Sequence, residues 1–223
     1  MATILITGAN RGIGLELVRQ YQTRGDDVVG VCRSTNTHLD ASGARVIDGV
    51  DVSTEAGISR LSEALRNTPV DVLINNAGIL RPDTLNAVDA ENMLEHFRVN
   101  TLGPLLVTQA LVGNLREGSK VGIVTSRIGS IEDNSSGKNY GYRTSKTAVN
   151  MVGTNLHHDL SPRGIAVLLL HPGHVQTDMT GGSGGTTPVE AAAGLIARLD
   201  ELSLETSGGF KHAEGYDLSL IHI

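Results

Sequence analysis

Short apolar runs alternate with longer helical patterns along most of the chain, and this alternation is the feature that most limits its possible folds. The runs are rich in Val, Ile and Leu with little polar alternation, as expected for parallel strands covered on both faces. Strand–helix alternation implies right-handed βαβ crossovers, and therefore an α/β fold with a doubly wound parallel sheet flanked by helices on both faces. The expected strands are residues 3–7, 28–32, 45–48, 70–75, 121–125 and 166–171.

The expected helices fill the gaps between these strands, and nothing marks a second domain. Pro188 suits the first turn of the last helix, where a proline is tolerated. With 223 residues, no internal repeat and no convincing linker, we expect one domain spanning 1–223. The glycine-rich segment at about 177–188 is interpreted as a loop that closes over the substrate. The expected helices are residues 13–24, 54–67, 89–116, 141–160 and 188–199.

Composition excludes several classes of protein. A net charge of −6 argues against a nucleic-acid or membrane-surface partner. The single cysteine, Cys32, rules out an intrachain disulfide framework. We find no apolar run of roughly 18 residues that would cross a membrane, and no signal-peptide pattern at the N-terminus. We therefore expect a cytoplasmic protein.

A glycine-rich turn follows the first expected strand and opens the first expected helix. Gly8 ends the strand, and Gly12 and Gly14 begin the helix with GxxxGxG spacing. Without a Cβ the backbone can approach a pyrophosphate, and the helix N-terminus offers free N–H donors and a positive dipole end. The alternative is that these glycines serve a purely steric purpose. The residues expected to bind the cofactor here are Gly8, Asn10, Arg11, Gly12, Ile13 and Gly14.

The end of the second expected strand bears on the choice of cofactor. An acidic residue there would bind a ribose 2′-hydroxyl, but this chain has Cys32 followed by Arg33. A 2′-phosphate could sit against Arg33, with Arg11 as a second cation, because the planar guanidinium suits a phosphate. We therefore expect NADP(H) in preference to NAD(H). The alternative is that both arginines are ordinary surface charges.

Two further segments suit a nucleotide crevice. Asp51 follows the third expected strand, where its carboxylate could accept a hydrogen bond from an adenine amino group; alternatively it caps the next helix, assisted by Ser53. Residues 75–78 end the fourth strand, where asparagine side chains could bridge backbone groups, although a simple turn would explain them too. The residues expected to contact the cofactor are Asp51, Val52, Asn76, Ala77 and Gly78.

Tyr142 and Lys146 are spaced to share one face of a helix, at positions i and i+4. A lysine cation beside the phenol, together with the positive charge of an oxidised nicotinamide, would favour the phenolate and lower the tyrosine pKa from about 10. Such a phenol could give a proton to a carbonyl oxygen as hydride arrives, and take it back in the reverse direction. The alternative is a half-buried tyrosine beside a solvated lysine.

In combination and in this order, these segments resemble the short-chain dehydrogenase/reductase family over nearly the whole chain. The resemblance rests on the glycine signature, the segment 75–78, and Tyr142 with Lys146, and it implies a Rossmann-type domain. Within the family, the chain is similar to small carbonyl-reductase-like members. The segments that carry this closer similarity are residues 140–143, 171–173 and 175–179.

The resemblance also implies roles for individual residues. Ser126 matches the serine that hydrogen-bonds the substrate carbonyl, and it is preferred over Ser130 because it ends the fifth strand. Asn100 matches an asparagine that supports a water relay to the lysine, and Lys146 would also bind the nicotinamide ribose. The implied catalytic residues are Asn100, Ser126, Tyr142 and Lys146. The further implied cofactor contacts are Tyr142, Lys146, Pro172, Gly173, Val175 and Thr177, the last on the carboxamide.

Two departures from the family pattern stand out. His174 occupies a position where this subgroup often has a bulky aromatic residue; it would shape the substrate pocket, or it is a tolerated surface histidine. The apolar tail 218–223 is unusual, and we interpret it as an interface segment or as a truncated or non-native end. The expected substrate pocket consists of Leu80, Arg127, Ile128, His174 and Met179.

The sequence therefore predicts an NADP(H)-dependent carbonyl reductase or alcohol dehydrogenase that needs no metal. The alternatives are an epimerase or dehydratase of the family, and a sensor or signalling protein that binds NADP(H) without turnover. The resemblance further implies a homodimer or homotetramer built on the helices that contain Asn100 and Tyr142.

Overall fold

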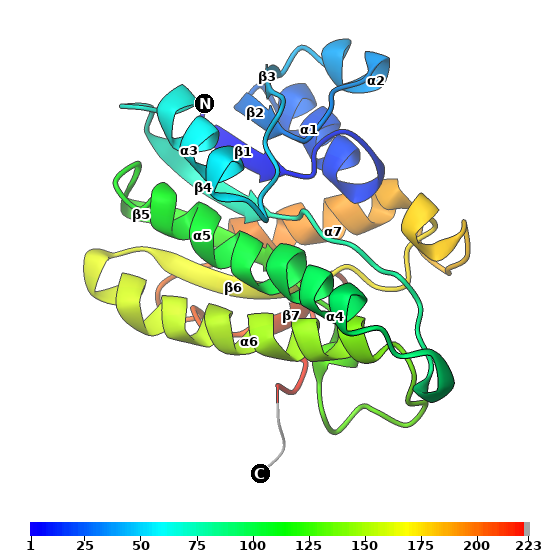
Figure 1. Ribbon diagram of the computed structural model, residues 1–223. Coiled ribbons are helices and arrows are strands. Elements are labelled where there is room, and N and C mark those ends of the chain that lie inside the picture. Colours follow the sequence, from blue (N-terminus) through cyan, green and yellow to red (C-terminus); the bar gives the residue numbers. More distant parts are fainter. Residues whose placement is uncertain (221–223) are drawn as a thin grey trace.

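The computed structural model describes residues 1–220, and they form a parallel sheet of seven strands in the order β3-β2-β1-β4-β5-β6-β7 (Figure 1). The α/β fold with a parallel sheet is thereby confirmed. The strands are β1 (Thr3–Thr7), β2 (Asp27–Val31), β3 (Arg45–Ile47), β4 (Val70–Asn75), β5 (Leu115–Val124), β6 (Ala166–His171) and β7 (Phe210–His212).

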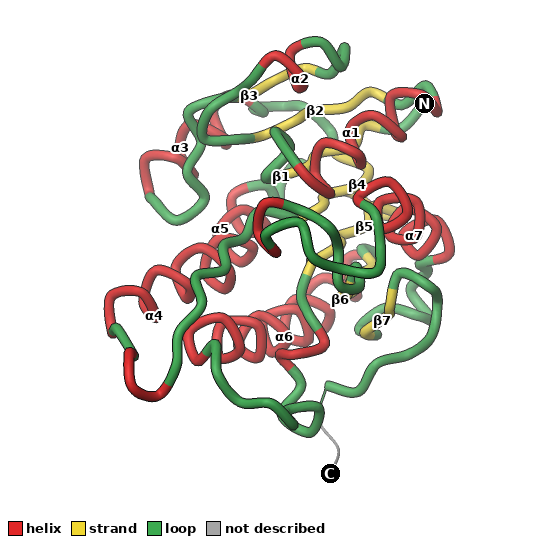
Figure 2. Tube along the Cα trace, turned by 90° about the vertical axis from the view of Figure 1, so that its right-hand side faces the viewer, coloured by secondary structure: helices red, strands yellow, loops and turns green. Residues whose placement is uncertain are grey.

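Helices cover both faces of the sheet. Figure 2 shows α3, α4, α5 and α6 on one side of the strands and α1 and α7 on the other. Each face buries its own apolar core, because alternate side chains of a strand point to opposite faces; Leu5 and Leu73 belong to one core, and Ile4 and Ile74 to the other. The helices are α1 (Gly12–Arg24), α2 (Thr37–Asp40), α3 (Glu55–Ala64), α4 (Ala90–Phe97), α5 (Gly103–Ala110), α6 (Tyr140–Leu160) and α7 (Pro188–Glu201).

The helix expected over 89–116 is present from Ala90 but ends earlier than expected, after Ala110. A π-helical turn, Arg98–Leu102, joins α4 to α5 within it. Asn114 then donates to the carbonyls of Leu65 and Thr68, 2.7 and 2.8 Å away, so the following residues join the sheet. The strand expected at 121–125 accordingly begins earlier, at Leu115.

Other boundaries differ less. The short helix α2 and the strand β7 were absent from the expected elements, since both are too short to show a period. The helix expected at 188–199 is present as α7, which starts with a capping box between Thr187 and Glu190. In the C-terminal tail, Leu218 and Leu220 pack against one apolar core, whereas 221–223 lie outside the described residues.

The strand order reverses between β1 and β4, which is where sheets of this kind bind ligands at their carboxyl ends. Thr7 and Asn76 join the two strand ends: the Thr7 hydroxyl accepts from the Asn76 backbone N–H at 3.0 Å, and the Asn76 amide donates to the Thr7 carbonyl at 3.0 Å. Within residues 1–220 no helix is long and apolar enough to span a bilayer.

Candidate active site

A crevice of about 970 Å³ lies at the carboxyl ends of the strands, over the point where the strand order reverses. The structure brings most of the expected cofactor residues into its wall, together with two of the expected catalytic residues. The expected residues that line it are Gly8, Asn10, Arg11, Gly12, Ile13, Gly14, Arg33, Asp51, Val52, Asn76, Ala77, Gly78, Tyr142, Lys146, Pro172, Thr177 and Met179. Those that do not are Leu80, Asn100, Ser126, Arg127, Ile128, Gly173, His174 and Val175.

The glycine turn leaves room for a phosphate beside the start of α1. Gly8 has φ +67°, and a Cβ there would lie 2.9 Å from the Ala77 Cα. A Cβ at Gly14 would lie 2.1 Å from the Gly8 carbonyl oxygen, so neither position has space for a side chain. Arg11 stands at the N-cap of α1 without a side-chain capping bond, which leaves the first backbone N–H groups free for an anion. This geometry fits a pyrophosphate.

Two arginines contribute to the crevice wall: Arg33, which follows β2, and Arg11, which stands at the start of α1. The Arg33 Nη1 lies 4.0 Å from the Asp51 Oδ2, and the Arg11 Nη1 lies 3.5 Å from the Asp178 Oδ2. Both arginine side chains are well exposed, at 62% and 65%, so these ion pairs are weak and leave the cations able to meet a phosphate. Arg33 and Arg11 are thus two exposed cations on the crevice wall.

Asp51 does not cap the next helix, which was its alternative role. The cap of α3 is Thr54, whose hydroxyl accepts from the Gly57 N–H at 3.1 Å. The Asp51 Oδ1 instead accepts from the Ser53 N–H and hydroxyl, at 2.9 and 2.6 Å. Burial raises the pKa of Asp51, but these two hydrogen bonds and nearby Arg33 outweigh it and leave the pKa lowered. The aspartate is therefore an anion that faces the crevice.

Tyr142, Ser126 and Lys146 come together where β5 and α6 meet. The Ser126 side chain hydrogen-bonds the phenol of Tyr142, and the Lys146 Nζ lies 5.7 Å from the centre of the tyrosine ring. The same Nζ donates to the Val124 carbonyl at 2.9 Å, which fixes the lysine against the end of β5. Ser130, the competing serine, is buried in the turn beyond Arg127.

In the protein by itself the Tyr142 pKa is raised, and the lowering expected from Lys146 together with an oxidised nicotinamide stays a prediction. Burial raises the pKa of Tyr142 to about 12, and the Ser126 hydrogen bond opposes this only in part. Burial also lowers the pKa of Lys146 to about 8, since an ammonium out of water is costly. Desolvation is therefore the largest influence on the pKa of both groups.

Asn100 lies directly beneath the crevice, within the π-helical turn. It is fully buried, its Oδ1 accepts from the Ile79 N–H at 2.8 Å, and its Nδ2 donates to the Ile79 carbonyl and the Ser145 hydroxyl at 2.9 and 3.0 Å. A Cβ at Gly78 would lie 3.3 Å from the Asn100 Oδ1 and 3.8 Å from the Lys146 Nζ. The glycine therefore keeps open the space between the asparagine and the lysine. π-helical turns of this kind are frequent at functional sites.

The expected substrate pocket is assembled only in part. Met179 lines the crevice, but the Arg127 Nε lies 3.1 Å from the Asp133 Oδ2, in the loop that leads to α6. His174 is exposed, and its Nε2 lies 3.4 Å from the Ser183 hydroxyl of the glycine-rich loop. The two ends of that loop are joined by a hydrogen bond, because the Gln176 N–H donates to the Thr186 carbonyl at 2.9 Å.

Several residues of this region were not predicted to belong to the site. Ser34 and Asn36 line the crevice, Asn36 as the cap of α2, and so do Gln176 and Asp178 from the segment 175–179. Asp83 is buried against the start of α6, 58 positions away along the chain, so no local pattern could indicate it. His96, also buried, stands edge-on to Tyr142 with 6.3 Å between ring centres. The role of His96 became visible only from its burial in the structure.

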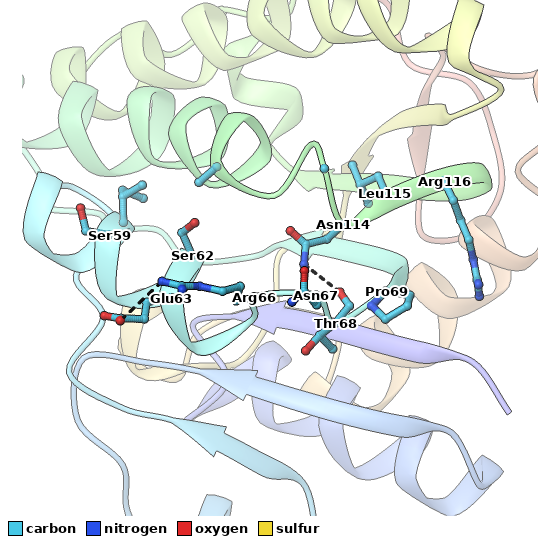
Figure 3. A pocket seen from close by; sticks show the side chains of 13 residues that line it. Ser59, Ser62, Glu63, Arg66, Asn67, Thr68, Pro69, Asn114, Leu115 and Arg116 are labelled. Carbon is cyan, nitrogen blue, oxygen red and sulfur yellow. Dashed lines mark hydrogen bonds and ion pairs between the residues drawn. The ribbon is translucent and has the colours of Figure 1, made fainter.

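A second hollow, of about 870 Å³, lies at the amino ends of strands β4 and β5, opposite the crevice (Figure 3). Its lining residues come from the ends of α3 and α5 and from the starts of β4 and β5. Its charged side chains form ion pairs, Glu63 with Arg66 and Arg116 with Asp71. Its wall contains no part of the Tyr142 cluster. Among the described residues, no group of three or more His, Cys, Asp or Glu could hold a metal ion.

Comparison with known proteins gives consistent results. Residues 2–186 match the family model described as short chain dehydrogenase. The chain is 47% identical over 223 residues to 1-hydroxy-2-glutathionyl-2-methyl-3-butene dehydrogenase of Rhodococcus sp. (strain AD45), covering 96% of this chain and 98% of that protein. It is 45% identical over 154 residues to C-signal of Myxococcus xanthus, covering 67% of this chain and 92% of that protein.

Solved structures agree with these sequence matches. NADPH-bound carbonyl reductase from chicken fatty liver superposes with a TM-score of 0.89 at 30% identity, covering 98% of this chain and 99% of that one. Carbonyl reductase Sniffer of D. melanogaster gives a TM-score of 0.90 at 28% identity, with the same coverage of both chains, 98% and 99%.

Proposed function

Because the chain belongs to the short-chain dehydrogenase family, we propose that it is an NADP(H)-dependent oxidoreductase that interconverts a ketone or aldehyde with the corresponding alcohol. The observation that carries this proposal is the cluster of Tyr142, Ser126 and Lys146: the tyrosine and the lysine line a crevice whose other end suits a dinucleotide, and the serine hydrogen-bonds the phenol from behind that wall. A proton donor, a second hydroxyl and a cation stand together where a carbonyl oxygen would need them.

The residues divide the chemistry between them. NADP(H), when bound, supplies or accepts the hydride. The phenol of Tyr142 keeps its proton at neutral pH, because its pKa is about 12, and gives it to the carbonyl oxygen as negative charge develops there. Ser126 donates a hydrogen bond toward the same oxygen and orients it. Lys146, held by the Val124 carbonyl, places a positive charge beside the phenol.

The cofactor would be held along the whole crevice. The glycine turn and the open N–H groups of α1 would bind the pyrophosphate, and Arg33 with Arg11 would bind the 2′-phosphate. Asp51 would accept from the adenine amino group, and Thr177 would contact the carboxamide at the other end. The NADPH carried by the chicken reductase supports this choice of cofactor.

The direct test is loss of NADPH absorbance with purified enzyme and a panel of ketones and aldehydes, and gain of absorbance with alcohols and NADP⁺. The panel should include an alcohol that carries a glutathionyl group, which we propose as the first substrate class because of the Rhodococcus relative. A sensor would bind NADPH without turnover, and an epimerase or dehydratase would convert substrate without a net absorbance change. Either result would overturn the proposal.

Cofactor preference has its own expected outcome. Arg33→Ala should weaken NADPH binding by about tenfold to a hundredfold, because it removes a charge-assisted contact with the 2′-phosphate, and should leave NADH binding nearly unchanged. Fluorescence titration of both nucleotides measures this. Arg45→Ala is the matched control, since Arg45 is an exposed arginine that caps the end of α3 through the Ala64 carbonyl. Equal losses of the two nucleotides would remove Arg33 from the phosphate site.

We also propose a cytoplasmic homodimer or homotetramer that associates through the α4 and α6 surfaces. Leu94 and Phe97 on α4 and Met151 on α6 are 45%, 42% and 57% exposed, which is unusual for large apolar side chains on helices of one layer. Sedimentation velocity of the wild type measures the association, and a monomer at micromolar concentration would contradict it.

A further inference from the structure

We propose that Asp83 is a positioning residue for the Tyr142 phenol, acting from the loop after β4 on the first turn of α6. The inference rests on the proposed function, since it concerns the group that moves the proton. Asp83 does not line the crevice and meets only the backbone of the helix, so it acts through Tyr142 and not on substrate.

Asp83 binds three consecutive backbone N–H groups at the start of α6. Its Oδ1 accepts from the Tyr140 N–H at 2.6 Å and its Oδ2 from the Gly141 N–H at 3.0 Å. Its backbone carbonyl accepts from the Asn139 N–H at 3.0 Å. The side chain is only 5% exposed, so these bonds are shielded from water. Its negative charge also suits the positive end of the helix dipole.

The helix has no cap of its own to replace this contact. Asn139, its N-cap residue, has φ +51° and makes no side-chain capping bond, and Lys138 before it has φ +57°. Two successive non-glycine residues in the left-handed region are unfavourable, and they persist only where the surroundings fix them. The Asp83 carbonyl holds the Asn139 N–H, and its carboxylate holds the next two N–H groups, in the turn that leads into Tyr142.

The loop that carries Asp83 is itself anchored at two earlier points. Asn100 bonds both backbone groups of Ile79, and the buried His96 accepts from the Arg81 N–H at 3.0 Å through Nε2. The His96 Nδ1 lies 2.8 Å from the Asn92 carbonyl, so both ring nitrogens contact backbone groups. The aspartate is therefore held from α4 and the π-helical turn.

Gly141 lets these groups approach each other. A Cβ at Gly141 would lie 2.9 Å from the His96 Nδ1 and 3.4 Å from the Asp83 Oδ2. The His96 ring then meets the Tyr142 ring edge-on, at an interplanar angle of 77°. The phenol is thus located by a chain of contacts from Asn100 through the loop to the helix start. A displacement of about 1 Å at a reacting group can cost roughly 10²-fold in rate.

Asp83→Ala tests the proposal against a purely structural role. We expect kcat for carbonyl reduction at 25 °C to fall by about ten- to a hundredfold, with the Kd for NADPH within about twofold of the wild type. Thr54→Ala, which removes the cap of α3, is the matched control: it should lower the melting temperature by a similar amount without changing kcat. Asp83→Asn keeps one acceptor oxygen, so its kcat should lie between those of Asp83→Ala and the wild type. A kcat in Asp83→Ala equal to that of Thr54→Ala would overturn the proposal.

Amide hydrogen exchange gives a readout that does not depend on turnover. The N–H groups of Tyr140 and Gly141 should exchange at least about tenfold faster in Asp83→Ala than in the wild type, while the amides of α7 keep their rates. If the wild type reduces no carbonyl compound, the proposed function fails and the exchange rates alone decide this inference. Unchanged exchange at Tyr140 and Gly141 would refute it in either case.

Discussion

Tyr142→Phe is expected to lower kcat for carbonyl reduction by roughly 10²- to 10⁴-fold, because it removes the group that gives its proton to the substrate oxygen. The affinity for NADPH should stay within about twofold of the wild type, since phenylalanine keeps the ring that packs at the crevice wall. Steady-state kinetics and single-turnover absorbance measure the chemical step, and fluorescence titration measures binding.

Tyr216→Phe is the matched control for this substitution. Tyr216 stacks on His212 at 4.4 Å near the C-terminal end of the described chain, and phenylalanine preserves that stack. Its kcat should equal that of the wild type. If Tyr142→Phe turns over as fast as Tyr216→Phe, the proton comes from another group and our assignment of the general acid is wrong.

The raised pKa of Tyr142 also sets a direction for the pH dependence. Since this pKa is about 12, the phenol carries its proton throughout the neutral range, and reduction should not lose rate there through ionisation of Tyr142. Alcohol oxidation needs the phenolate, so its rate should rise with pH over the same range. This rise in the oxidation rate should disappear in Tyr142→Phe.

The sequence predicted those parts of the site in which function depends on local spacing. Gly8 and Gly14 stand where a Cβ would strike backbone, and a residue type excluded by sterics can be recognised from its pattern alone. Tyr142 and Lys146 share a helix face because they stand four positions apart in α6. The parallel, doubly wound sheet followed from strand–helix alternation, because βαβ crossovers leave few other topologies.

Contacts between distant segments could not be predicted in this way. Nothing near Asp83 in the chain indicates that it binds the first turn of α6, and the ion pair of Arg127 with Asp133 depends on the path of a loop. The direction of the Tyr142 pKa in the protein alone could not be predicted for a related reason. Spacing shows which charges are near, whereas desolvation depends on everything packed around the phenol. The π-helical turn between α4 and α5 likewise contains Asn100, whose buried side chain bonds Ile79 and Ser145 from distant segments.

Lys146→Met is expected to lower kcat/KM for carbonyl reduction by about 10²- to 10³-fold, as the loss of one fixed charge or donor at a reacting centre commonly does. Methionine has nearly the same length and apolar stem, so the packing of α6 on β5 is kept. Burial lowers the pKa of Lys146 to about 8, so in the wild type the ammonium is present below this pH and is lost as the pH rises through it. The wild-type kcat/KM for carbonyl reduction should therefore fall above about pH 8. In Lys146→Met, kcat/KM should be low and should not change with pH across the same range.

Lys120→Met separates this effect from the general cost of losing a lysine in the interior. Lys120 also has a pKa lowered by burial, and its Nζ donates to the carbonyls of Leu199 and Asp200 at the end of α7, at 2.6 and 2.9 Å. It caps a helix and lies outside the crevice wall, so its loss should lower the melting temperature and leave the pH profile of kcat/KM unchanged. If the fall above pH 8 persists in Lys146→Met, another group titrates there. If both variants lose activity equally, the lysine acts through stability, and its charge has no part in moving the proton.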